Sequence, residues 1–179
     1  MNDHLEPIFK IILPSMKQAG INYWVFGGIS ISAYVGYFFR NNVDVDVFVL
    51  DEDFKNAMEI LEKMCRKNNF LYKRSGKKDE RPKFEIKIDG VERFSVIPVY
   101  KSKNIIIFEY NDGNQRYSCD ILKREENNLS GFKFYSPSKN FIKEMFLNHI
   151  KARPDKVTRK KIIMDAERIL TKEEFEKIF

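Results

Sequence analysis

Two aspartates in the segment VDVDVFVL, residues 43–50, most constrain how this chain folds. The β-branched and aromatic residues around them are typical of a buried strand. A carboxylate there costs several kcal/mol unless it is paired, protonated or bound to a metal. Alternation along a strand places Asp44 and Asp46 on one face, about 6.5 to 7 Å apart. At that separation they would bridge one or two hard divalent cations, so we predict a metal site.

A pair of glycines precedes this strand. Gly27-Gly28 lies between a predicted strand, residues 23–26, and a predicted helix, residues 29–37. Missing side chains at such a turn let a phosphate reach backbone N–H groups and the helix N-terminus. Ser30, just inside the helix, would add a hydroxyl. We therefore predict a phosphate seat close to the two aspartates.

Hydrophobic spacing and turn residues outline the remaining elements. Residues 5–16 have helical spacing, which Pro14 should kink or split. The other predicted strands are residues 84–88, 94–100, 104–110 and 115–122, with turns at Asp89-Gly90 and Asn111-Asp112-Gly113. The other predicted helices are residues 51–69, 138–153 and 156–170, and a last one that begins with a Thr171–Glu174 capping box. This order predicts an α/β (α+β) fold with a mixed sheet flanked by helices. We expect a core at residues 1–135 and a helical segment at 136–179 that packs on it.

Composition narrows the classes of protein. With 179 residues and 43% hydrophobic content, the chain can bury one sizeable core. The net charge of +6 is concentrated at residues 66–103, which carry 12 Lys/Arg against 5 Asp/Glu and would favour a nucleotide or RNA. Cys65 and Cys119 are too few and too far apart for a disulfide scaffold or a zinc site. No stretch resembles a signal peptide or a membrane span, so we expect a soluble cytoplasmic protein without a membrane partner.

The combined motifs resemble the nucleotidyltransferase superfamily that includes DNA polymerase β. The resemblance is strongest to antibiotic nucleotidyltransferases and to AbiE-type toxins of toxin–antitoxin pairs. The family pattern is an apolar residue with two small residues, a helix and then Asp-x-Asp, often with Arg four residues before the first Asp. Here Phe26-Gly27-Gly28, Asp44-Val45-Asp46 and Arg40 match it.

By this resemblance, Asp44 and Asp46 would be catalytic and would hold Mg²⁺ or Mn²⁺, which bridges the triphosphate during attack on the α-phosphate. Gly27, Gly28 and Ser30 would seat the distal phosphates. The implied activity is transfer of NMP from an NTP to an unidentified acceptor, which would be a small molecule, a protein or an RNA. The toxin branch would add an antitoxin as a partner.

Two basic residues complete the nucleotide-binding set that the resemblance implies. Arg40 would either touch a phosphate or brace the aspartates through an ion pair. Lys143, on the helix that follows Ser136-Pro137-Ser138, would reach a phosphate across the cleft. The basic stretch Arg159-Lys160-Lys161 leading to Asp165 also fits the family's tail.

The family's third carboxylate is replaced here. It falls on Ser95 in RFSVIPV, residues 93–99, and serine cannot act as the general base or bridge the metal as a carboxylate does. Ser95 is kept as a nucleotide-binding candidate, and Glu85 would supply the missing catalytic carboxylate if a three-residue loop, 89–91, placed it opposite Ser95. A two-residue loop would instead place Glu85 opposite Phe94, pointing away. Asp120 is a more distant candidate.

Two competing hypotheses follow. The first is a catalytically degenerate protein of the same fold that binds nucleotide or RNA, motivated by Ser95. The second is a glycosyltransferase that holds a sugar nucleotide through Mn²⁺ at Asp-x-Asp. It is disfavoured because residues 47–50 continue the strand, where that class normally opens into a loop, and because the chain is short.

Overall fold

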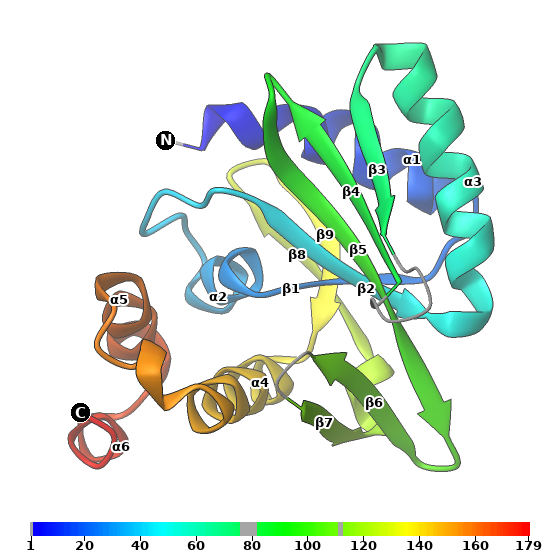
Figure 1. Cartoon of the computed structure of the whole chain (residues 1–179). Helices are drawn as coiled ribbons and strands as arrows, with labels where there is room; N and C mark the ends of the chain where they lie inside the picture. Colours follow the sequence, from blue (N-terminus) through cyan, green and yellow to red (C-terminus); the bar gives the residue numbers. More distant parts are fainter. Residues whose placement is uncertain (1, 76–81, 111–112) are drawn as a thin grey trace.

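A mixed β-sheet forms the centre of the molecule. The computed structural model describes residues 2–75, 82–110 and 113–179. Within these residues the strand order is β1-β2-β5-β4-β3, and β6 and β7 extend the sheet from the C-terminal end of β5 (Figure 1). Only β2 and β5 pair in parallel among these described strands. The strands are β1 (Tyr23–Phe26), β2 (Val45–Leu50), β3 (Leu71–Ser75), β4 (Lys83–Ile88), β5 (Val91–Ser102), β6 (Ile105–Tyr110) and β7 (Gly113–Ser118).

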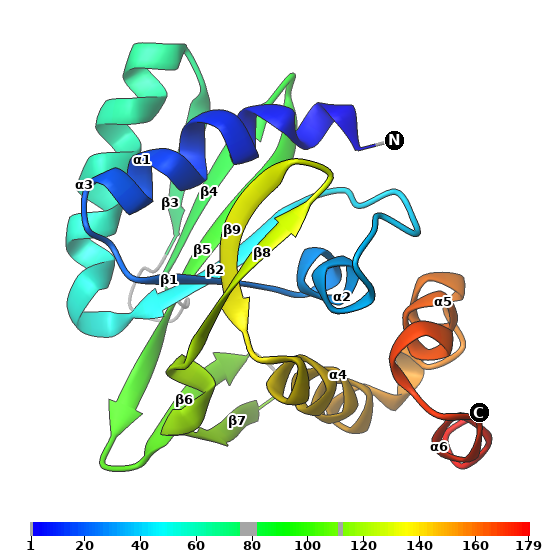
Figure 2. The same cartoon turned by 180° about the vertical axis from the view of Figure 1, so that it is seen from behind.

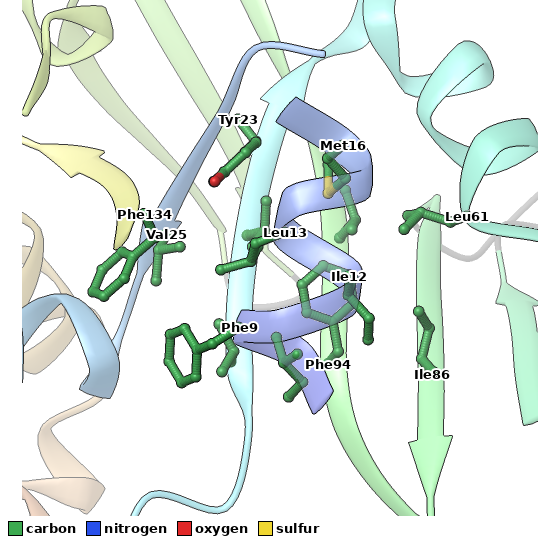
Figure 3. Packing of buried hydrophobic residues seen from close by; sticks show 14 of the residues in the cluster. Phe9, Ile12, Leu13, Met16, Tyr23, Val25, Leu61, Ile86, Phe94 and Phe134 are labelled. Atoms are coloured by element: carbon green, nitrogen blue, oxygen red, sulfur yellow. The ribbon is translucent and has the colours of Figure 1, made fainter. Parts of the chain in front are cut away.

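One face of the sheet carries the main hydrophobic core. The helices α1 (Leu13–Gln18) and α3 (Asp51–Asn68) cover this face, and a hairpin of β8 (Arg124–Leu129) and β9 (Phe132–Pro137) lies beside them (Figure 2). Alternate strand residues such as Val25, Val47 and Phe94 are fully buried there. Figure 3 shows Leu13 and Met16 of α1 packing toward the same cluster. The opposite face carries a second apolar cluster around Phe48 beside the polar side chains of the site.

The C-terminal helices are α4 (Lys139–Ala152), α5 (Lys160–Ile169) and α6 (Lys172–Glu176), whereas α2 (Gly28–Val35) lies between β1 and β2 in the sequence. The C-terminal helices lie on the opposite side, where α4 and α5 pack against α2 and α6 packs against α5. Apolar side chains of these helices form a separate buried cluster that includes Ile31, Phe146 and Ile162; Figure 1 shows the helices side by side. The second apolar cluster joins α4 to β6 and β7 around Trp24 and Phe108. The predicted boundary between residues 135 and 136 falls inside β9, just before this helical part.

The observed architecture confirms the predicted α/β fold with a mixed sheet flanked by helices. The glycine turn, α2, α3 and the Asp-x-Asp strand form where the hydrophobic spacing predicts them. The capping box at Thr171 and Glu174 is present. No helix in the described parts of the chain is long and apolar enough to cross a membrane.

Several elements differ from the sequence prediction. The strands β3, β8 and β9 were not predicted, because they are short and largely polar on their exposed side. Pro14 is accommodated by a π-helical turn, Ile8–Ile12, directly before α1. The predicted strand at 115–122 ends at Ser118, where a 3₁₀ turn begins with the Ser118 side chain as its cap. The predicted helix at 156–170 begins only at Lys160, after a 3₁₀ turn at Pro154. Asn111 and Asp112 of the predicted turn lie outside the described residues.

Candidate active site

A row of side chains crosses the sheet on the face opposite the main core. Strand pairing places Phe26 beside Asp46, Asp46 beside Ser95, Ser95 beside Glu85, and Glu85 beside Lys73. Residues directly opposite each other on neighbouring strands point to the same face. The row therefore brings two of the candidate acids and Ser95 onto one surface.

One cavity of about 770 Å³ collects the predicted motif residues. Asp44 lies just before β2 and Asp46 within it, and both line the cavity together with Gly27, Gly28 and Ser30. The sequence expectation of one shared cleft therefore agrees with the geometry. Ser95 also lines this cavity, and further lining residues come from β3, β4, β6, α4 and α5.

The glycine turn fits closely against its neighbours. Gly27 has a φ of +69°, and a Cβ atom there would lie 3.3 Å from Asp46 Oδ2. A Cβ atom on Gly28 would overlap Arg40 Nη2 and lie 2.6 Å from Asn42 Oδ1. Among the residues that the structure describes, no side chain caps the N-terminus of α2. The Ser30 hydroxyl donates to the Gly27 carbonyl at 2.8 Å, so it already has a backbone partner.

The motif acids interact unfavourably while no cation neutralises them. Burial raises the pKa of Asp46 to about 6, and the charge of Asp44 acts in the same direction. The Ser95 hydroxyl donates to Asp46 Oδ1 at 2.6 Å and opposes this shift, as do the charges of Lys83 and Lys161. A divalent cation would relieve the repulsion between the two carboxylates.

The donor set fits Mg²⁺ held jointly with a nucleotide. Among the described residues, no group of three or more His, Cys, Asp or Glu side chains is placed to hold a metal. Mg²⁺ is usually bound by one or two carboxylates together with substrate phosphates and water. Asp44 and Asp46 supply such a pair beside the uncapped α2 N-terminus.

The β4–β5 hairpin combines the two registers that the sequence left open. Its turn has two residues, because Ile88 pairs with Val91, yet Glu85 still pairs with Ser95. A bulge between Ile86 and Lys87 of the ladder, opposite the extra residue Arg93, restores the register. Sequence patterns alone did not reveal this bulge.

Glu85 nevertheless has another partner. It lies two strands from Asp46, about 10 Å at the usual strand spacing. Lys83 Nζ lies 2.7 Å from Glu85 Oε1. Although burial acts in the opposite direction, the hydrogen bond and charge of Lys83 lower the pKa of Glu85, which makes it a weak base. Asp120, the more distant candidate, pairs with Lys123 at 2.9 Å on the exposed surface.

The two predicted basic ligands have carboxylate partners in the structure. Arg40 binds Asp165 of α5 through Nε at 2.5 Å and Nη2 at 3.0 Å, rather than either motif aspartate. Lys143 Nζ lies 2.8 Å from Glu174 of α6 and is not among the described residues that line the cavity. The expected bracing of Asp44 and Asp46 by Arg40 is thus replaced by an anchor to the C-terminal helices.

Several cavity residues were missed as site candidates. The cationic ones are Lys73, Lys83, Arg153 and Lys161. Lys161 belongs to the basic stretch before Asp165, so its spacing from that acid was an available signal. His149 of α4 also lines the cavity. The pairing of β3 and β4 with β5 brings Lys73 and Lys83 to the acids, whereas the packing of α4 and α5 on α2 brings the remaining three residues.

Comparisons with protein-family models and with curated proteins found no match. Solved structures do match over nearly the full chain. The lincosamide antibiotic adenylyltransferase LnuA with bound lincomycin has a TM-score of 0.60 at 18% identity and covers 100% of this chain and 98% of its own. The antibiotic-resistance factor ANT(2'')-Ia has a TM-score of 0.64 at 15% identity in solution, covering 99% of this chain and 90% of its own. Its crystal structure with adenylyl-2''-tobramycin has a TM-score of 0.64 at 15% identity, covering 96% and 92%. The chain therefore has the nucleotidyltransferase fold.

Proposed function

We propose that the protein is an Mg²⁺-dependent nucleotidyltransferase that moves NMP from an NTP to an acceptor. The observation that carries the proposal is the shared cavity, in which Asp44 and Asp46 lie beside the glycine turn at the α2 N-terminus. In the reaction, the oxygen of an acceptor hydroxyl bonds to the α-phosphorus as the bond to the bridging oxygen breaks; pyrophosphate leaves, and the hydroxyl proton is released to solvent. Mn²⁺ is an alternative ion for the same two carboxylates.

Each motif residue has a proposed role. The metal, when bound, neutralises the triphosphate and the charge that develops during transfer. Asp44 and Asp46 hold it, and the N–H groups at Gly27 and Gly28 receive the distal phosphates. Lys161 takes the phosphate-binding role that sequence alone had assigned to Lys143, because its side chain lines the cavity and its charge acts on Asp46.

We propose a small hydroxylated molecule as the acceptor. A protein and an RNA end are the alternatives. Lincomycin is bound in one similar structure, and adenylyl-2''-tobramycin in another. Activity on an RNA or protein acceptor would favour a toxin role with an antitoxin as partner. Each alternative predicts label in a different fraction of a cell extract.

The direct test uses the four NTPs, each labelled at the α-phosphate. Purified protein is incubated with each NTP, Mg²⁺ and cell extract, and separately with lincomycin or tobramycin. We expect metal-dependent label in one acceptor fraction, and a loss of about 100-fold or more in Asp46→Asn. Asp155→Asn, an exposed acid on a 3₁₀ turn, serves as the matched control. No labelled product and no Mg²⁺-dependent NTP binding would refute the proposal.

The alternative is a degenerate nucleotide-binding protein, which the Ser95 hydrogen bond to Asp46 favours. Ser95→Asp would restore a carboxylate beside Asp46, and Ser95→Asn controls for side-chain size. A gain of transfer activity in Ser95→Asp alone indicates degeneration of an ancestral site. Equal or lower activity in both variants favours a working site that uses serine.

A further inference from the structure

The loop between α2 and β2 supports the proposed phosphate-binding turn at Gly27-Gly28. Residues 36–44 contain no helix or strand, so contacts from elsewhere determine the loop's conformation. Arg40 Nη2 and Asn42 Oδ1 fill the space beside Gly28 where a side chain would otherwise lie. Asp44 follows two residues later. A shift of this loop would therefore move both the glycine turn and Asp44.

An ion pair holds this loop from the C-terminal side. The Arg40 and Asp165 side chains are only 6% and 4% exposed, and the guanidinium contacts both carboxylate oxygens. A buried pair of this kind contributes little net stability compared with apolar side chains, because both charges lose their hydration. Its two parallel hydrogen bonds do, however, fix orientation.

Residues near the N-terminus hold the same loop from the other side. Asn2 donates from Nδ2 to the Arg40 carbonyl at 3.1 Å and accepts from the Asn42 N–H at 2.7 Å. His4 Nε2 lies 2.7 Å from the Asn42 carbonyl oxygen. These contacts fix the backbone of the loop. The Arg40 side chain is then oriented by its hydrogen bonds to Asp165.

The same anchor sets the position of a cavity cation. Lys161 lies one helical turn before Asp165 on α5 and lines the cavity. Its charge acts on both Asp46 and Asp165. Fixing Asp165 against Arg40 therefore also fixes Lys161 relative to the motif acids.

We propose that Asp165 is a positioning residue for nucleotide binding. Through Arg40 it holds the 36–44 loop against Gly28, and through α5 it keeps Lys161 at the cavity. The role of Asp165 in nucleotide binding rests on the proposed function. Its effect on the conformation of the loop does not depend on that function.

The test replaces the ion pair by two apolar side chains of similar combined length. In Arg40→Met/Asp165→Met no charge is left buried, so the variant should unfold in urea at a denaturant concentration close to that of the wild type. We expect its Mg²⁺-dependent affinity for NTP, measured by titration calorimetry, to fall about 10- to 100-fold. The control is Lys17→Met/Glu126→Met, which removes a 3.1 Å ion pair that joins α1 to β8 outside the cavity lining. A folded Arg40→Met/Asp165→Met variant with wild-type affinity would overturn the proposal.

Amide hydrogen exchange separates this proposal from the proposed function. If the wild type binds no NTP, the proposed function fails, and exchange in residues 28–32 and 41–44 still decides the role of Asp165. Faster exchange confined to these segments in the double variant supports the role, and unchanged exchange overturns it. Should the double variant not fold, Asp165→Glu keeps the charge but lengthens the side chain by one methylene. If amide exchange in residues 28–32 and 41–44 of Asp165→Glu equals that of the wild type, this result counts against the proposal.

Discussion

At the scale of single residues, the site holds a carboxylate in an environment that penalises its charge. Asp46 is half-buried between Ser95 and the glycine turn, and desolvation raises its pKa to about 6 from an ordinary value of 3.8. Folded protein therefore binds this proton more tightly than the unfolded chain. The resulting penalty is fully present above pH 6 and is relieved as the pH falls toward 3.8.

Asp46→Asn should therefore stabilise the metal-free protein while removing metal-dependent binding of NTP. At pH 8 we expect a gain in the free energy of unfolding of about 1 to 3 kcal/mol, because the neutral amide carries no such penalty. Near pH 4 the gain should shrink toward zero. Urea unfolding at the two pH values measures it, with Asp155→Asn as the exposed control. A variant less stable than the wild type at pH 8 would contradict the electrostatic explanation.

At the scale of elements, the β4–β5 hairpin decides which side chains face the cavity side of the sheet. Its tight turn alone would direct Glu85 toward the main core. The bulge at Arg93 adds one residue to β5 and turns Glu85 back to the row that holds Asp46 and Ser95. Lys83, at the start of the same strand, then pairs with Glu85.

The ion pair with Lys83 and the distance of two strands make Glu85 a poor substitute for the third carboxylate. Glu85→Gln should reduce NMP transfer less than about tenfold, since a lysine-paired carboxylate contributes little as a base. Transfer rates measured beside Asp46→Asn test this expectation. A loss as large as that of Asp46→Asn would instead assign the third carboxylate to Glu85.

At the scale of the whole molecule, distant segments close one core. Phe9, from the turn before α1, stacks on Phe132 at a ring-centroid distance of 4.9 Å and lies 5.5 Å from Phe134 (Figure 3 shows Phe9 and Phe134). Its ring also contacts Phe38 in the loop of residues 36–44, at a ring-centroid distance of 6.3 Å. The β8–β9 hairpin is thus packed against the N-terminal segment.

Phe9→Ala should destabilise the protein by about 3 to 5 kcal/mol, because it leaves a cavity where these rings meet. Leu71→Ala, at a site with 66% exposure, should change stability by less than about 0.5 kcal/mol. Chemical denaturation of both variants measures the difference. Similar losses in the two would show that the Phe9 cluster is not part of the cooperative core.

The local sequence pattern was sufficient to predict those parts of the fold and of the site that depend on residues close together in the sequence. Hydrophobic periodicity predicts α3 and the Asp-x-Asp strand, and the paired glycines predict the turn before α2. Asp44, Asp46 and the glycine turn could be placed together because only one short helix and one loop connect them.

Tertiary structure alone decided the partners of the charged residues. Arg40 and Asp165 are 125 positions apart, and no local spacing relates them. Lys161 enters the cavity only because α5 packs on α2, and Glu85 faces Ser95 only because of a bulge. Short-range sequence patterns encode which backbone conformation a segment prefers. The pairing of buried charges instead depends on which segments the hydrophobic clusters bring together.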